Sequence, residues 1–70
     1  MRNIFKFPDG AELDFTYPTD RFIEVGETFA LHYKNEKRYA TINRIETHKD
    51  QHKIYYYLEF KSTPIGSLSN

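Results

Sequence analysis

The segment Tyr39–Ile45 reads YATINRI, and it determines most of the fold that we expect for this chain. Ile42 and Ile45 are three positions apart, so they cannot share a face of a regular strand, in which side chains alternate. A β-bulge at Asn43–Arg44 removes the conflict, because one extra residue resets the alternation. The bulge predicts that apolar side chains before and after it lie on one face of a sheet.

Two neighbouring segments are predicted to pair with this one as antiparallel strands. The first is reached through a turn centred on Asn35–Glu36, and the second through a turn at Lys49–Asp50. With these turns, apolar residues face apolar residues across the sheet. The expected pairs are Phe29 with Ile42, Leu31 with Ala40, Ile45 with Ile54 and, beyond the bulge, Ala40 with Leu58.

The N-terminal part of the sequence predicts a further hairpin. Asp9–Gly10 lies between two alternating segments, 3–7 and 11–16, and Asp-Gly is a strong hairpin signal. The connection that follows contains Pro18, which argues against a central strand there. We expect three apolar side chains after it to close one end of the core: Phe22, Ile23 and Val25.

Together these segments predict an all-β fold. Five short antiparallel strands form a small SH3-like barrel or a strongly bent sheet, since no stretch shows a sustained helical period. The 70 residues allow one domain, which we place at residues 1–61. Residues 62–70 are rich in Pro, Gly and Ser and are expected to form a flexible C-terminal tail.

The run Val25–Phe29, followed by Tyr39–Ile45, resembles a pattern in short uncharacterised SH3-like β-barrel proteins of bacteria and phages. The resemblance covers about half of the chain. It implies the barrel fold and a bacterial or phage origin, and it carries over no site residues.

Composition restricts the classes of function. The net charge is zero, whereas non-specific nucleic-acid binders are basic. The absence of Cys excludes a disulfide framework and Cys-ligated metals, and it favours a cytoplasmic location. The N-terminus lacks the apolar block of a signal peptide, and no apolar run is long enough to cross a membrane.

Catalysis finds little support in the sequence. There is no Cys, and the serines all follow residue 61, so no nucleophile lies on a rigid frame. Glycines are isolated turn residues and form no phosphate-binding loop. We therefore expect no enzymatic activity and no cofactor.

Two polar groups have a functional and a structural interpretation. His48, Asp50 and His52 could ligate a metal, but on a hairpin tip the two imidazoles splay apart. The pairs Glu12 with Asp14 and Glu24 with Glu27 could act as acid and base, but nothing predicts the desolvation that would separate their pKa values. We favour a solvated turn and solvated carboxylates, and no metal site.

The outward face of the last three strands is the best candidate for a binding surface. The predicted pairing brings aromatic and polar side chains together there: Tyr39, Tyr55, Tyr57, His32, Thr41 and Arg44. Exposed aromatic groups of this size mark an interface or a second small core. Alternatively, the N-terminal hairpin or the tail covers them, or the tyrosines are ordinary strand formers.

Charge is distributed unevenly along the chain. Residues 1–29 carry three basic and six acidic side chains, and residues 30–70 carry seven and four. A basic cluster of Lys34, Lys37 and Lys61 is predicted at one end of the sheet. Combined with the tyrosines it could hold single-stranded nucleic acid. Alternatively, the two halves neutralise each other across the fold or between subunits.

The sequence thus predicts a small non-catalytic binding or regulatory protein that acts through protein–protein contact. A phage-encoded modulator of a host protein is one concrete form, and a homodimer is another use of the same surface. The alternative is nucleic-acid or nucleotide binding by the Tyr- and Lys-bearing face. A third possibility, a nucleotide held in a pocket between subunits, is favoured by nothing in the sequence.

Overall fold

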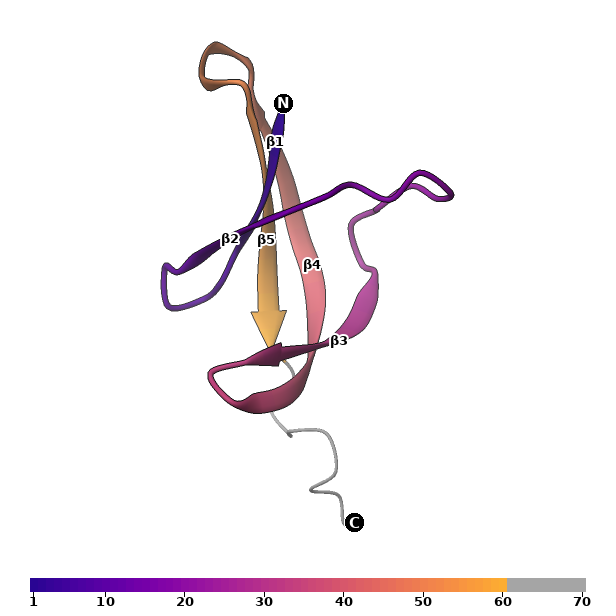
Figure 1. Cartoon of the computed structure of the whole chain (residues 1–70), viewed down its shortest axis with the longest axis vertical. Helices are drawn as coiled ribbons and strands as arrows, with labels where there is room; N and C mark the ends of the chain where they lie inside the picture. Colours follow the sequence, from indigo (N-terminus) through magenta and orange to yellow (C-terminus); the bar gives the residue numbers. More distant parts are fainter. Residues whose placement is uncertain (61–70) are drawn as a thin grey trace.

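The computed structural model describes residues 1–60, which form one five-stranded sheet (Figure 1). The strands lie in the order β2-β1-β5-β4-β3, which confirms the all-β class. In chain order the elements are β1 (Arg2–Lys6), β2 (Glu12–Phe15), β3 (Thr28–Tyr33), β4 (Glu36–His48), a 3₁₀ turn η1 (Lys49–Gln51) and β5 (Lys53–Phe60). The predicted tail at 62–70, and Lys61, lie outside the described residues.

The sheet is mixed, whereas the sequence predicted antiparallel strands throughout. β1 runs parallel to β5, with Ile4 opposite Tyr55 and Lys6 opposite Tyr57. The backbone N–H of Arg2 donates to the carbonyl of His52 at 2.8 Å where this pair begins. Alternation reveals which side chains share a face but not the direction of a distant partner strand, so this pairing was missed.

The bulge in β4 is confirmed. The β4–β5 register shifts between Ile42 and Arg44, so that Ile42 lies opposite Leu58 and Ile45 opposite Tyr56. Both isoleucines thereby pack on the core side of the sheet. The sequence conflict between their positions is resolved as expected.

The predicted register of β3 against β4 was wrong by two residues. Phe29 lies opposite Ala40 rather than Ile42, because the turn is Lys34–Asn35 rather than Asn35–Glu36. Both turn residues have positive φ, 50° and 67°, as in the tight hairpin turns whose twist matches that of the strands.

The predicted register of β4 against β5 was also wrong by two residues. Ala40 lies opposite Phe60 rather than Leu58, and Ile45 opposite Tyr56 rather than Ile54. The turn is longer than expected, since it contains η1 and ends on His52 in the left-handed region. An even shift keeps every side chain on its predicted face, so the expected core survived both errors.

The sheet curves strongly and encloses the core on its concave side. β1 and β3 are separated by two strands in the sheet, yet the rings of Phe5 and Phe29 are 5.4 Å apart. Phe7 stacks on Tyr33 at 4.2 Å in the same way. In a flat sheet these strands would be about 14 Å apart. The structure is therefore a half-barrel, and an SH3-like identity stays a prediction. The buried core residues on the concave side are Phe7, Ala40, Ile42, Tyr56 and Leu58.

Only one of the three side chains predicted to close the core does so. Ile23 packs against the core, and its N–H donates to the Tyr17 hydroxyl at 2.8 Å. Phe22 is 82% exposed and Val25 60% exposed. Residues 16–27 lead from β2 at one edge of the sheet to β3 at the other (Figure 1). The sequence does not reveal which residues of such an irregular connection point inward.

A polar cluster around Asp9 joins the two ends of the curved sheet. Its carboxylate accepts hydrogen bonds from the Tyr33 hydroxyl at 2.6 Å and from Lys34 Nζ at 2.8 Å. The N–H of Ala11 donates to the same carboxylate at 3.0 Å. The β1–β2 turn is thereby tied to the β3–β4 turn.

Candidate functional site

The candidate site lies on the convex side of the sheet, opposite the core. The cross-strand register puts Tyr57 of β5 between Lys6 of β1 and Arg44 of β4. Tyr55 lies between Ile4 and Glu46 in the next row. We call this area the tyrosine surface and define it by the side chains of Lys6, Arg44, Glu46, His48, Lys53, Tyr55 and Tyr57.

The two tyrosine rings lie close together and next to cations. Their centroids are 6.1 Å apart. The guanidinium carbon of Arg44 is 4.2 Å from the centroid of Tyr57, and Lys6 and Lys53 Nζ are 5.7 Å and 5.9 Å from that of Tyr55. Cations at these distances are attracted to the faces of aromatic rings. The rings are half-buried, which reduces their freedom to move.

Glu46 links the side chains of the tyrosine surface. Its carboxylate accepts a hydrogen bond from the Tyr57 hydroxyl at 3.3 Å and forms an ion pair with Arg44 Nε at 2.9 Å. His48 Nε2 lies 3.3 Å from the same carboxylate, and its ring meets Tyr55 edge-on at 5.0 Å. One carboxylate thus orients three neighbours, and both tyrosines are held by contacts from β4.

Carboxylates of β2 balance the cations of β1. Lys6 Nζ lies 2.8 Å from Glu12, and Arg2 Nε lies 3.0 Å from Asp14. The hydrogen bond from Lys6 lowers the pKa of the Glu12 carboxyl, and that from Arg2 lowers the pKa of the Asp14 carboxyl. The Glu12 and Asp14 side chains lie on the outer face, as expected, and each forms an ion pair.

Ile4 belongs to this area and was missed by the sequence reasoning. It is 0% exposed, although alternation puts it on the side opposite Phe5 and therefore opposite the core. Its flanking residues on the same face are the long side chains of Arg2 and Lys6, and its neighbour on β5 is Tyr55. The sequence does show an apolar residue at an outward position of β1. Its burial could be inferred only by knowing that β1 pairs with β5.

The other predicted surface residues lie nearer the β3–β4 hairpin. Tyr39 is 44% exposed and lies opposite Ala30 rather than beside His32. His32 lies opposite Lys37, and Thr41 shares a hydroxyl–hydroxyl hydrogen bond of 2.9 Å with Thr28. Tyr39 is five residues from Arg44 along β4, a span of about 16 Å. Tyr39 and His32 therefore lie away from the tyrosine surface, whereas Thr41 lies opposite Glu59, two residues along β5 from Tyr57.

The predicted basic cluster is not a free group of lysines. Lys34 is paired with Asp9, and its Nζ is 5.3 Å from the Tyr33 ring. Lys37 lies on β4 opposite His32, and Lys61 is outside the described residues. The structure therefore gives no geometry for these three lysines acting together.

The other polar groups lie at the β4–β5 turn or make local contacts. His48 contacts Glu46, while Asp50 lies in η1 and His52 ends that turn. The Glu27 carboxylate accepts a hydrogen bond from the backbone N–H of Glu24 at 3.1 Å and forms an ion pair with Arg21. Within residues 1–60, no three or more His, Cys, Asp or Glu side chains are arranged to hold a metal ion.

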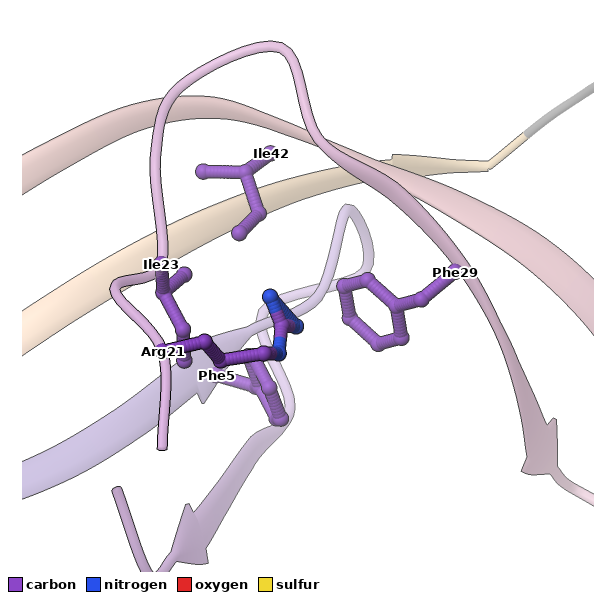
Figure 2. A pocket seen from close by; sticks show the side chains of 5 residues that line it. All are labelled: Phe5, Arg21, Ile23, Phe29 and Ile42. Atoms are coloured by element: carbon purple, nitrogen blue, oxygen red, sulfur yellow. The ribbon is translucent and has the colours of Figure 1, made fainter. Parts of the chain in front are cut away.

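Among the pockets that the described residues form, one small and one larger adjoin the sheet. One, of about 110 Å³, lies on the concave side beneath the guanidinium of Arg21, among Phe5, Ile23, Phe29 and Ile42 (Figure 2). It is smaller than the pockets that hold drug-sized ligands. The other, of about 560 Å³, lies beside Tyr57 at the bulge of β4.

Comparison with known proteins assigns no family to this chain. The part of the chain that the structure describes contains no helix long and apolar enough to span a membrane. No protein-family model, no curated protein and no solved structure matches this chain.

Proposed function

We propose that this protein is a non-catalytic binding protein that acts in the cytoplasm by contact with another protein, through the tyrosine surface. The observation that carries the proposal is the arrangement of Tyr55 and Tyr57 between cations that are themselves matched by carboxylates. Protein interfaces are enriched in Tyr and Arg, and their strongest contacts come from such rigid side chains. A surface with balanced charge suits a protein partner better than a polyanion.

Two partners fit this proposal. The resemblance to phage proteins favours a host protein that the chain modulates, and a second copy of the chain would form a homodimer. A Tyr side chain buries on the order of 150 Å² or more. At about 25 cal/mol per Å² of apolar area, two tyrosines contribute a few kcal/mol to association before ordering costs.

The test compares Tyr57→Ser with Tyr39→Ser, which also removes an outer-face tyrosine but leaves the tyrosine surface intact. Sedimentation velocity over a wide concentration range measures self-association, and affinity capture from the native host measures partner binding. We expect Tyr57→Ser to weaken whichever association the native chain shows, and Tyr39→Ser to leave it unchanged. Equal effects of the two variants, or a partner retained by Tyr57→Ser, would contradict the proposal.

Single-stranded nucleic acid is the second candidate. Arg44 against the ring of Tyr57, with Lys6 and Lys53 near Tyr55, is a combination that can stack bases and hold phosphates. A salt titration separates the two functions. Phosphate-dominated binding weakens steeply with salt, whereas a tyrosine-centred protein contact responds much less.

A further inference from the structure

The larger pocket lies where the bulge of β4 meets the β1–β2 turn. Its lining includes Lys6, Phe7, Asn43, Arg44, Tyr57 and Leu58. Its volume of about 560 Å³ falls within the range of small-molecule sites. Bulges often adjoin functional sites, because they redirect side chains. Here the bulge brings Asn43 and Arg44 to one wall of the pocket.

The lining of this pocket holds two cations, each of them ion-paired to a carboxylate outside the lining. It contains Lys6 and Arg44 and no carboxylate, because the acidic partners Glu12 and Glu46 lie outside it. Each of these two ion pairs is made through one nitrogen, while an ammonium offers three N–H donors and a guanidinium five. The two cations flank Tyr57 from neighbouring strands, so their backbones are about 10 Å apart. Side chains of this length can converge on one anion.

The rest of the lining suits a flat, partly apolar group. Phe7 and Leu58 line the base of the pocket, although they are only 3% and 4% exposed and their side chains pack in the core. Tyr57 supplies an aromatic wall, whose ring already contacts the guanidinium of Arg44. Asn43 is exposed at the bulge and carries both a donor and an acceptor. A ring with polar edges would find contacts on all of these groups.

We infer that this pocket binds a small anion joined to an aromatic ring, of the class of nucleoside monophosphates. The anion lies between Lys6 and Arg44, and the ring lies beside Tyr57 and Asn43. This site goes beyond the protein contact proposed above and does not depend on it. The same chemistry is present in a free nucleotide and in a single-stranded nucleic acid.

The test is an NMR titration of the ¹⁵N-labelled chain with adenosine 5′-monophosphate. Adenosine, which lacks the anion, and inorganic phosphate, which lacks the ring, are the matched probes. We expect saturable shifts at residues 6–10, 43, 44, 57 and 58. Each half-probe should bind about tenfold or more weakly than the nucleotide, as when a charge-assisted hydrogen bond is lost. Phosphate binding as tightly as the nucleotide, or an absence of saturable shifts at these residues, would overturn the inference.

Variants separate the pocket from the general charge of the surface. Arg44→Gln should weaken nucleotide binding about tenfold or more, as expected for the loss of a charged donor. Lys49→Gln removes an exposed cation in η1, outside both the pocket and the tyrosine surface, and it should leave the affinity unchanged. Arg44 is exposed, so neither variant threatens the fold. Equal weakening by both variants would show diffuse electrostatic attraction and refute a site at the pocket.

A single-stranded oligonucleotide identifies the source of the ligand. Tighter binding than the mononucleotide, with shifts at the same residues, assigns the pocket to nucleic acid, and equal binding assigns it to a free nucleotide. Both results support the inferred chemistry, whereas oligonucleotide shifts confined to other residues would contradict it. These titrations contain no protein partner. Their failure would leave the proposed protein contact standing, and failure of that contact would leave the pocket standing.

Discussion

Asp9 accepts hydrogen bonds from both ends of the curved sheet, and its titration should therefore affect the whole fold. Hydrogen bonds from Lys34, Tyr33 and the N–H of Ala11 hold the pKa of its carboxyl well below the ordinary value of 3.8. A carboxyl whose pKa is lower in the folded than in the unfolded chain stabilises the fold above the unfolded pKa. That contribution is lost as the pH falls through the folded value.

We expect Asp9→Asn to lower stability at neutral pH and to reduce the loss of stability below about pH 4. Urea unfolding of the native chain and the variant, at neutral pH and along an acid series, measures both effects. Asp20→Asn, which removes an exposed carboxyl elsewhere, is the control. If Asp9→Asn and the native chain lose stability equally below pH 4, the contacts of Asp9 do not hold in solution.

Tyr56 and Tyr57 are neighbours in β5 but point to opposite sides of the sheet. Tyr56 is 3% exposed, its ring lies 5.1 Å from that of Phe15, and its hydroxyl donates to Asn3 at 2.9 Å. Tyr56→Ser should cost about 3 kcal/mol or more of unfolding free energy, as truncation of a buried aromatic does. Tyr57→Ser should cost about 1 kcal/mol, because its ring is half-buried and its contacts are on the surface. Chemical denaturation measures both, and equal costs would mean that the outer face is a second core.

At the scale of the elements, the bulge and the turns decide which side chains meet. The bulge in β4 follows from the sequence because it is a local conflict between Ile42 and Ile45. The two-residue shifts of register do not follow, because Lys34 and Asn35 are not a pair that sequence patterns favour for a tight turn. Their positive φ values are imposed by the pairing of β3 with β4.

Gly26 leads into β3 with a φ of +94°, and its N–H donates to the carbonyl of Ile42 at 2.8 Å. A Cβ there would meet no atom within 4 Å, so any cost of substitution comes from the backbone conformation. We expect Gly26→Ala to cost roughly 1–2 kcal/mol of unfolding free energy, because L-residues disfavour this region. Thermal and urea unfolding measure the change.

Chemical synthesis of the 70-residue chain permits a matched control with D-alanine at position 26. A D-residue favours positive φ, so this chain should be at least as stable as the native one. Equal destabilisation by both alanines would show that the cost is steric or that the turn has another conformation.

At the scale of the whole molecule, β1 holds the fold together. It lies between β2 and β5, carries Ile4 on one side and Phe5 on the other, and contacts residues about 50 positions away in sequence. A small domain buries only about 60% of its unfolded surface, so it has little stability to spare. Without β1, the remaining strands lose the buried Ile4 on one side of the sheet and Phe5, which packs against the core, on the other.

A chain that lacks residues 1–6 should therefore show no cooperative unfolding transition and no dispersed amide spectrum. The control is a chain that ends at Lys61, the predicted domain boundary. We expect this chain to unfold like the full chain. Circular dichroism and NMR compare the three chains. A cooperative transition in the chain without residues 1–6 would show that β2 to β5 fold without β1.

The sequence by itself determined the strands, the bulge and the assignment of each side chain in the paired strands to a face. These features depend on alternation, which is local and survives a register shift of two residues. For the candidate site it placed Tyr55, Tyr57 and Arg44 on one face, because all three lie within the bulged hairpin, but the structure sets Arg44 opposite Tyr57 rather than beside Tyr55.

Only the tertiary structure decided the parallel pairing of β1 with β5, and with it the burial of Ile4 and the position of Lys6 beside Tyr57. It also decided that Tyr39 and His32 lie away from the tyrosine surface. The physical reason is that direction and register depend on contacts between distant segments. Those contacts are selected by the packing of the aromatic side chains inside the curved sheet, which no local pattern encodes.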